Sequence, residues 1–379
     1  MNFATTAILL SAASLGHFAI TVWLFNRLHA IGGPRRLIKV LEKVLLAIAP
    51  IVLLLIVASA PWRGAAGLGS LFLSFYVAIC FLAAVLIIPL WLVPKLMERT
   101  PAALMSNDTT VVDVAQRLEF RPLHGEARLL AYLPGNQLLQ IAVQQKTIRL
   151  PNLSPSLDGL RIAHLSDLHM TGQLGREFYD LVVDETNSLA PDIVVITGDI
   201  LEKEPCLPWI QLTLGRLKAN SGKFFILGNH EHRLADATLL RSALAKAGFI
   251  HLGGKCQSLV VHSAEILLAG TELPWFGTAP MLPADDSAAF RILLSHSPDQ
   301  LNWAKSNQFD LMLAGHTHGG QIRLPWLGAL IAPSLYGTRY AGGLYVEPPT
   351  LLHVSRGLAG IHPLRFNCPP ELALLILKR

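Results

Sequence analysis

Three long apolar runs in the first quarter of the chain constrain its fold more than any other feature. Residues 7–25, 44–60 and 70–93 contain no Asp, Glu, Lys or Arg, and His17 is the one histidine among them. A helix needs roughly 20 apolar residues to cross a bilayer, so we predict three spanning helices at these positions. The composition agrees, since 52% of the residues are hydrophobic and 15% are charged, with a mean hydropathy of +0.44. A soluble globular protein is less apolar than this.

The basic residues around these runs predict an orientation. No Lys or Arg precedes the first run, so we interpret it as a spanning helix and not as a cleaved signal peptide. Five Lys or Arg residues lie between the first and second runs, one lies between the second and third, and Lys95 and Arg99 follow the third. The positive-inside rule then places everything after residue 95 in the cytoplasm. We therefore expect a multi-pass protein of the inner (cytoplasmic) membrane, an orientation that reverses if one run does not insert.

The bulk charge and the cysteines exclude several classes of function. The formal net charge is +5, and much of the basicity lies in the loop after the first apolar run, which favours anionic lipid headgroups over nucleic acid. The four cysteines are far apart and form no CxxC pair, so they indicate neither a disulfide framework nor a thiolate metal site.

Short apolar runs dominate the sequence after residue 138. They predict strands at residues 138–143, 160–165, 193–197, 224–227, 259–261, 266–269, 290–294, 311–314, 351–354 and 372–377. Apolar residues at helical spacing predict helices at 178–189 and 238–247. Strands that alternate with helices indicate an α/β sheet core. We interpret 97–140 as a linker on the membrane side with a short helix at 111–118, which gives a transmembrane region (1–95), a linker leading into the catalytic domain (96–150) and a catalytic domain (151–379).

Polar side chains with metal-binding chemistry follow five of these predicted strands. They are Asp167 and His169, Asp199, Asn229 and His230, His296, and His316 and His318. Open α/β sheets build their sites at the carboxyl ends of strands. A set of His, Asp and Asn without Cys suits two divalent ions such as Mn, Fe or Zn. Two such ions sharing one carboxylate could hold a bridging hydroxide and stabilise an in-line displacement at phosphorus.

The order of these motifs resembles the calcineurin-like metallophosphoesterase superfamily from about residue 160 to the C-terminus. The sequence of residues 295–299 and 315–321 is most similar to that of the bacterial YkuE/YaeI and LpxG-type membrane-anchored branch. The resemblance implies a metallophosphoesterase β-sandwich flanked by helices, here preceded by an all-α transmembrane region of about three helices. It also implies metal ligands and a catalytic residue: Asp167, His169, Asp199 and His318 for one ion, Asp199, Asn229, His296 and His316 for the other, and His230 beside the leaving group.

One position departs from the family pattern. Related proteins usually carry an aspartate where this chain has Glu202, and that aspartate is thought to orient the histidine that matches His230. Glutamate reaches one methylene further, so we expect this contact to be reshaped or absent while the metal ligands are unaffected.

Other histidines and arginines are interpreted as structural. His232, His251, His262, His353 and His362 match no motif. Arg323, Arg356 and Arg365 could bind phosphate, but a surface or structural role is favoured. Three segments remain candidates for the rim of a substrate pocket: residues 173–178, 202–214 and 275–286.

These features predict a membrane-anchored phosphoesterase that uses a metal-activated hydroxide on a phosphodiester or pyrophosphate. Its partners would be the bilayer and a membrane lipid or lipid-linked phosphoester. The LpxG-type resemblance implies UDP-2,3-diacylglucosamine, cleaved to lipid X and UMP in lipid A synthesis. Alternatives are a broad phosphodiesterase of the YkuE/YaeI type and a non-catalytic membrane scaffold or sensor. A transporter is disfavoured, because the apolar runs contain no Asp, Glu, Lys or Arg. The sequence leaves the metal identity and the oligomeric state open.

Overall fold

The chain divides into two compact units, which are described separately. The computed structural model describes residues 3–30, 35–59, 68–96, 100–283 and 290–379. The helical unit comprises Met1–Arg99 and Trp326–Arg339, and the sandwich unit comprises Thr100–Pro325 and Tyr340–Arg379. The predicted turn at residues 61–64 lies outside the described residues.

The helical unit contains the three predicted apolar helices. They are α1 (Phe3–Ala30), α2 (Arg35–Ser59) and α3 (Leu68–Leu96), and each is long and apolar enough to cross a membrane. The helices are longer than the apolar runs, because the flanking basic residues continue the helix at α2. Pro94 directly follows the third apolar run, and α3 continues past it to Leu96. A proline removes a single backbone donor, and a long helix held by its remaining hydrogen bonds tolerates that loss.

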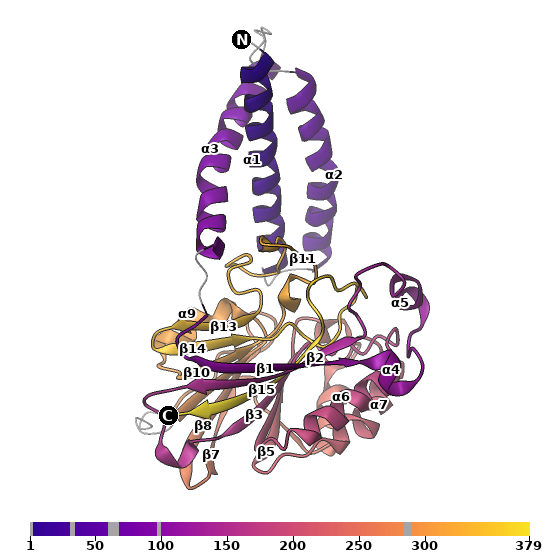
Figure 1. Cartoon of the computed structure of the whole chain (residues 1–379), viewed down its shortest axis with the longest axis vertical. Helices are drawn as coiled ribbons and strands as arrows, with labels where there is room; N and C mark the ends of the chain where they lie inside the picture. The colour runs from indigo at the N-terminus through magenta and orange to yellow at the C-terminus, as the bar shows by residue number, and fades with distance from the viewer. Residues whose placement is uncertain (1–2, 31–34, 60–67, 97–99, 284–289) are drawn as a thin grey trace. The chain divides into compact units, whose positions relative to one another are not determined.

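Close packing and one polar side chain join the three helices, which Figure 1 shows side by side. A Cβ atom on Gly16 of α1 would lie 1.7 Å from the carbonyl oxygen of Cys80 in α3, so only glycine allows this approach. The neighbouring His17 is buried. Its Nδ1 lies 2.7 Å from the Tyr76 hydroxyl of α3, and its Nε2 lies 2.9 Å from the Ala49 carbonyl oxygen of α2. Both ring nitrogens therefore have partners, as an apolar medium requires.

A late segment of the chain, Trp326–Arg339, belongs to the helical unit. Side chains near the C-terminal ends of α1 and α3 hydrogen-bond to it. The bonds are Asn26 Nδ2 to Leu330 O (3.3 Å), Ala332 N to Asn26 Oδ1 (3.0 Å), Trp91 Nε1 to Thr338 Oγ1 (2.9 Å), and Lys95 Nζ to Leu327 O (2.8 Å) and Ala329 O (2.6 Å). Trp326 in this segment is 93% exposed. We call Trp326–Arg339 the docking segment.

The sandwich unit is built on two sheets. The seven-stranded sheet runs, in spatial order, β1 (Leu104–Asp113), β2 (Gln140–Arg149), β15 (Glu371–Lys378), β3 (Arg161–Leu165), β4 (Ile193–Thr197), β5 (Gly222–Ile226) and β6 (Phe249–His251). The six-stranded sheet runs β13 (Gly343–Glu347), β14 (Thr350–Val354), β10 (Leu311–Ala314), β9 (Phe290–Ser295), β8 (Ala264–Thr271) and β7 (Lys255–Val261). The short strand β11 (Arg323–Leu324) lies outside these two sheets, and β12 (Gly328–Ala329) belongs to the docking segment of the helical unit. Strands β3 to β6 are parallel, as are β8, β9, β10 and β14.

Successive side chains of the seven-stranded sheet point to opposite faces and pack in two separate hydrophobic cores. Ile162, Val195 and Phe224 pack toward the six-stranded sheet. Ala163, Val194 and Phe225, each one residue away, pack in the core that contains the helices. These helices are α4 (Val114–Leu118), α5 (Gly125–Leu130), α6 (Arg176–Ser188), α7 (Leu207–Leu212) and α8 (Ala237–Lys246), while α9 (Leu301–Ser306) follows β9. The fold is a β-sandwich flanked by helices, as predicted (Figure 1).

The segment interpreted as a linker contains a strand. β1 covers residues 104–113 and pairs antiparallel with β2, and helix α4 begins only at Val114, so the helix predicted at 111–118 is wrong over its first three residues. The strand was missed because most of its side chains are exposed. The strand therefore has no apolar face, and its sequence lacks the alternation of apolar and polar residues that marks a half-buried strand.

A buried polar network crosses the interior of the sandwich. Lys146 Nζ donates to Glu371 Oε1 at 2.6 Å and lies 2.8 Å from His353 Nε2. His353 Nδ1 lies 2.9 Å from His164 Nδ1, and His164 Nε2 lies 2.9 Å from Thr197 Oγ1. One set of neutral tautomers satisfies every ring nitrogen, because His353 accepts from Lys146 and donates to His164, which donates to Thr197. The histidine that the sequence assigned to a structural role, His353, has that role here.

This network predicts acid sensitivity. Burial, followed by the Lys146 charge, lowers the pKa of His353 to about 4. Below the unfolded pKa of about 6.5 the unfolded chain binds a proton that the folded protein does not, so the free energy of unfolding falls as the pH falls from 6.5 toward 4. We expect the titration of His353 to lower the free energy of unfolding by about 2 kcal/mol at pH 5 relative to pH 7. Thermal unfolding of the protein in detergent at both pH values measures the loss.

The matched comparison uses two histidine variants. His353→Gln is expected to lose part of the pH dependence, whereas His262→Gln, at a half-exposed imidazole, is expected to retain it. An unchanged pH dependence in His353→Gln would contradict the assignment.

Candidate metal centre

The predicted ligands lie at the carboxyl ends of five strands. Asp167 and His169 follow β3, Asp199 follows β4, and Asn229 and His230 follow β5, all on adjacent parallel strands of the seven-stranded sheet. His296 follows β9, and His316 and His318 follow β10, which are adjacent parallel strands of the other sheet. Parallel neighbours end at the same edge, so each sheet collects its polar loops at one place.

The first group of ligands contains Asp167, His169, Asp199 and His318. One ligand atom from each lies within 4.8 Å of the others. His169 Nε2 is 3.2 Å from His318 Nε2 and 3.5 Å from Asp199 Oδ2, and His318 Nε2 is 3.5 Å from Asp167 Oδ1. Four side-chain nitrogen and oxygen atoms that converge at such distances resemble the ligands around a cation.

The second group contains Asp199, His296 and His316, again with ligand atoms within 4.8 Å. His296 Nε2 is 3.1 Å from His316 Nδ1, 3.3 Å from Asp199 Oδ2 and 3.1 Å from the amide oxygen of Asn229. Asn229 therefore lies with this group. Asp199 belongs to both groups, so the structure brings all seven predicted ligands together around one shared carboxylate.

Two buried polar atoms show that these residues fit metal ions. Asp199 Oδ2 and His316 Nε2 are both buried and have no hydrogen-bond partner within the protein. Leaving a buried carboxylate oxygen or ring nitrogen unpaired costs about 1–3 kcal/mol. A divalent cation coordinated by these atoms would remove that cost, and the donor set of carboxylate, imidazole and amide suits Mn, Fe or Zn.

The backbone at the ligands is strained. Five ligand residues have positive φ angles: Asp167 (52°), His169 (40°), Asp199 (51°), His316 (71°) and His318 (51°). This left-handed conformation is uncommon for residues with a Cβ and concentrates at functional sites. The three sharp turns after β3, β4 and β10 therefore direct side chains toward one place at a conformational cost.

Two glycines allow these loops to approach one another. A Cβ on Gly315 would lie 1.8 Å from Ser166 Oγ and 2.5 Å from Asp167 Oδ2. A Cβ on Gly228 would lie 2.3 Å from Asp199 Oδ1. The glycines of the motifs are thus required for close contact between the ligand loops.

The charged groups of the site keep the carboxylate of Asp199, which both ligand groups share, negatively charged. Burial raises the pKa of Asp199, but His230, His296 and His169 outweigh it, so the net pKa lies well below its ordinary value. Burial lowers the pKa of His296, and Asp199 and Asp167 reverse the shift and raise it to about 9. Asp199 is therefore negatively charged, and its charge attracts protonated imidazoles around it.

Glu202 joins His169 to His230. Its Oε1 lies 2.8 Å from His169 Nδ1 and also hydrogen-bonds to His230 Nδ1. Of the two expected outcomes, a reshaped or an absent contact with His230, the structure has a contact that is present and that the same carboxylate oxygen shares with His169. With both Nδ1 atoms engaged, each ring presents Nε2 to the ligand cluster. His230 Nε2 is 3.9 Å from Asp199 Oδ2.

Arg233 is a site residue that the sequence did not identify. Its Nη1 donates to Glu202 Oε2 at 2.9 Å, and its Nη2 lies 3.1 Å from His230 Nε2. Glu231–Arg233 form a single 3₁₀ turn after His230, which returns the arginine to the side of the histidine three residues earlier. The three-residue spacing between His230 and Arg233 is the feature of the sequence that could have identified this arginine.

Glu231 holds two ligand loops together. Its fully buried carboxylate accepts four backbone N–H bonds, from Asp199 (3.2 Å), Ile200 (2.6 Å), Leu201 (3.2 Å) and Gly228 (2.7 Å). Burial and then the Asp199 charge raise the pKa of Glu231 to about 7, and the N–H donors oppose that rise. These contacts give Glu231 a role in holding the loops.

Replacing Glu231 with glutamine is expected to destabilise the protein by about 2–4 kcal/mol. The amide nitrogen would face backbone N–H groups, leaving buried donors without acceptors. Thermal or denaturant unfolding of the purified protein measures the loss, and Glu265→Gln at an exposed position of β8 is the control. Wild-type stability in Glu231→Gln would show that the four bonds contribute little.

Other predicted candidates lie in structural positions. Arg365 is fully buried and donates to the carbonyl oxygens of His318, Arg356, Gly357 and Ala359. Arg356 pairs with Glu371 at 3.0 Å. Trp275, from one of the three candidate rims, lies with its ring centroid 4.9 Å from His316 and 5.4 Å from His296, so it covers the second group.

Comparisons with known proteins agree with this geometry. Residues 160–320 match the family described as calcineurin-like phosphoesterase. The chain is 32% identical over 246 residues to the uncharacterized metallophosphoesterase YkuE of Bacillus subtilis, covering 63% of this chain and 86% of that protein. It is 28% identical to phosphodiesterase YaeI of Escherichia coli (57% and 82% covered). It is 27% identical to the UDP-2,3-diacylglucosamine pyrophosphatase LpxG of Chlamydia muridarum (60% and 86% covered).

Proposed function

Because the chain belongs to the calcineurin-like phosphoesterase family, whose members are two-metal hydrolases of phosphoesters, we propose that it hydrolyses a lipid-linked phosphodiester or pyrophosphate at a membrane surface. The observation that carries the proposal is the pair of ligand groups that share Asp199, whose buried Oδ2 lies close to ligand imidazoles of both groups and has no hydrogen-bond partner in the protein. A single shared carboxylate between two groups is the arrangement that two-metal catalysis uses.

In this proposal Asp167, His169, Asp199 and His318 hold one ion, and Asp199, Asn229, His296 and His316 hold the other. When bound, the ions supply Lewis-acid activation of water and neutralise charge at phosphorus. The chain itself supplies the positions: strained loops set the ligands and Glu231 fixes the loop that carries Asp199.

His230 is proposed as the proton donor to the leaving oxygen. Glu202 accepts from Nδ1, so Nε2 faces the site, where a proton can be delivered. Arg233 Nη2 donates to the same nitrogen at 3.1 Å, so His230 delivers a proton only after Nε2 is protonated and this hydrogen bond is released. The guanidinium then adds positive charge where the leaving oxygen develops negative charge.

A membrane-resident substrate is supported by three features. The helical unit has three helices able to cross a bilayer, which is more anchorage than a soluble substrate needs. The docking segment, which hydrogen-bonds to helix ends, begins eight residues after His318 in the sequence. The named activity of the LpxG relative makes UDP-2,3-diacylglucosamine the specific candidate. The YaeI relative favours a broader phosphodiesterase as the second candidate.

The orientation follows from charge. Basic residues gather at the end of α1 (Arg27), in the first turns of α2 (Arg35, Arg36, Lys39 and Lys43), and at or after the end of α3 (Lys95 and Arg99). We therefore propose an inner-membrane protein whose phosphoesterase domain lies in the cytoplasm. Residues 1–95 would be the membrane region, 96–150 the connection and 151–379 the phosphoesterase domain.

The test is hydrolysis by purified full-length protein with added Mn. UDP-2,3-diacylglucosamine in mixed micelles is compared with bis-p-nitrophenyl phosphate, and Asp199→Ala is the control. We expect Asp199-dependent cleavage of the lipid with little cleavage of the dye ester. The reverse preference would assign the broader phosphodiesterase, and no cleavage of either would favour the scaffold or sensor.

A further inference from the structure

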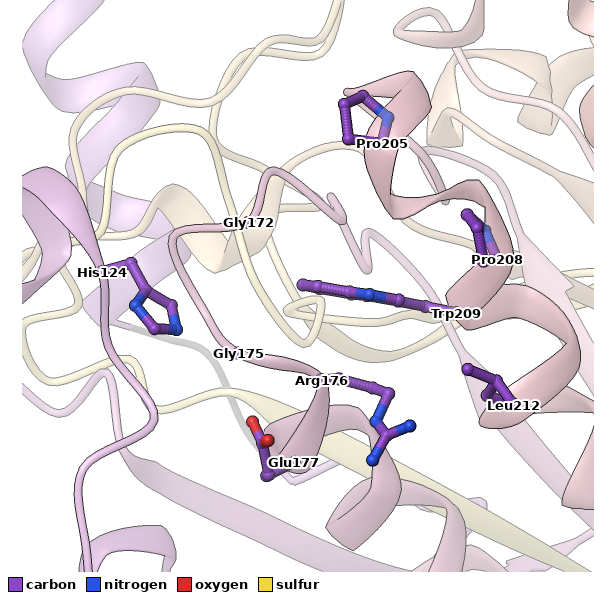
Figure 2. A pocket seen from close by; sticks show the side chains of 9 residues that line it. All are labelled: His124, Gly172, Gly175, Arg176, Glu177, Pro205, Pro208, Trp209 and Leu212. Carbon is purple, nitrogen blue, oxygen red and sulfur yellow. The ribbon is translucent and has the colours of Figure 1, made fainter.

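A pocket separate from the ligand cluster opens in the sandwich unit (Figure 2). It lies between the loop Gly172–Glu177 and the segment Pro205–Leu212, and its volume is about 420 Å³. Pockets that bind small molecules range from roughly 300 to 1,000 Å³. The two walls are two of the three segments that the sequence left open as pocket rims.

Both walls continue directly from the metal-site loops. Gly172 is three residues after His169, and Pro205 is three residues after Glu202. The two loops run side by side where they leave the site, because Glu202 N and Lys203 N both donate to Met170 O at 3.3 Å. Three residues span at most about 11 Å between Cα atoms, so Gly172 lies within that distance of His169 and Pro205 lies within it of Glu202. A substrate whose phosphorus lies at the ligands can reach the pocket.

The indole of Trp209 is the central surface of this pocket. Figure 2 shows it extending from α7 toward the loop Gly172–Gly175, with His124 on the far side. Its ring centroid lies 6.1 Å from that of Tyr179, a buried residue. The Tyr179 hydroxyl donates to Leu168 O at 2.9 Å within the metal-site loop. The indole is therefore held against the loop that carries His169.

The groups around the indole are apolar on one side and polar on the other. Pro205, Pro208 and Leu212 line the α7 side, and Leu212 is 50% exposed. His124, Arg176 and Glu177 line the opposite side. The backbone holds that side in place, since His124 N donates to Gln173 O and Gly175 N donates to Pro122 O, both at 2.8 Å. A cation, a carboxylate and an imidazole thus surround a flat aromatic surface.

We propose that this pocket binds the nucleobase of a nucleoside-phosphate ester, an inference that rests on the proposed function. A flat base stacks on the indole, and its in-plane donors and acceptors pair with Arg176, Glu177 and His124. An acyl chain would cover the same three polar groups without offering them hydrogen bonds, which is unfavourable. The base therefore fits the pocket better than the lipid does, and the acyl chains of a lipid-linked substrate lie elsewhere.

The kinetic test compares two esters with the same leaving group, using full-length protein in detergent with Mn. The p-nitrophenyl ester of thymidine monophosphate carries a base, and methyl p-nitrophenyl phosphate does not. We expect the wild-type protein to prefer the nucleotide ester through a lower KM. Trp209→Ala should reduce the ratio of kcat/KM between the two esters by about 5- to 150-fold, and Trp209→Phe should retain most of it.

A binding measurement gives an independent readout. Calorimetry with UMP and with inorganic phosphate should show tighter binding of UMP to the wild-type protein and near-equal binding to Trp209→Ala. Equal binding of the two ligands by the wild-type protein, or an equal loss of both in the variant, would overturn the nucleobase pocket. If the wild-type protein cleaves neither of these esters nor UDP-2,3-diacylglucosamine, the proposed function fails first. Cleavage of both esters without preference would contradict the nucleobase pocket and leave the proposed phosphoesterase function standing.

Discussion

Asp199→Asn is expected to lower kcat for phosphodiester hydrolysis by at least about 1,000-fold, equivalent to about 4 kcal/mol of transition-state stabilisation. Asp199 is shared by both ligand groups, and its Oδ2 lies 3.3 Å from His296 Nε2 and 3.5 Å from His169 Nε2. An amide has no negative charge and one acceptor oxygen, so it cannot serve two cations. We expect the purified variant to contain fewer metal ions per chain than the wild-type protein. Steady-state kinetics and elemental analysis of the same preparations measure both effects.

The matched control is Asp108→Asn at an exposed position of β1, which makes the same chemical change outside the site. Its activity and metal content should equal those of the wild-type protein. A variant at Asp199 that keeps full activity would remove the carboxylate from the proposed mechanism, and one that keeps two ions but loses activity would assign it a different role.

The second large effect is expected from His230→Gln, which should lower kcat by about 100- to 10,000-fold, the range typical of a lost general acid. His230 is held by Glu202 through Nδ1 and has Nε2 3.9 Å from Asp199 Oδ2, so it is close to the ligands. The loss should depend on the leaving group. An alkyl phosphodiester needs protonation of its leaving oxygen and should lose more activity than a p-nitrophenyl ester, whose leaving group departs as the anion.

His262→Gln, a substitution of the same type at a half-exposed histidine of the sandwich unit, controls for nonspecific effects. Metal content should be unchanged in both histidine variants. An equal loss of activity for alkyl and p-nitrophenyl esters would contradict proton donation by His230 and would favour electrostatic stabilisation instead.

The position of the site could be predicted from sequence because the residues with metal-binding side chains directly follow predicted strands. Apolar runs such as 193–197 and 311–314 appear as β4 and β10 with unchanged bounds, and the polar residues directly after them converge. The contacts of the supporting residues could not be predicted. The Glu202 carboxylate reaches both His169 and His230, and that geometry depends on two loops whose relative position only the folded sheet defines.

Elements without a buried side were missed for a different reason. β1 is mostly exposed along its length, and β13 alternates weakly, so neither carries the apolar pattern of a core strand. The docking segment was also unexpected. Its attachment to Asn26 and Lys95 joins residues more than 200 positions apart through side chain to backbone bonds, which leave no periodic signal.

The most direct test of the account is a metal titration of the metal-stripped, full-length protein while hydrolysis of a phosphodiester is followed. We expect no activity without metal, and activity that reaches its maximum only after about two equivalents of Mn have bound, as two ligand groups sharing Asp199 require. Full activity in the stripped protein, or saturation at one equivalent, would contradict a two-metal centre.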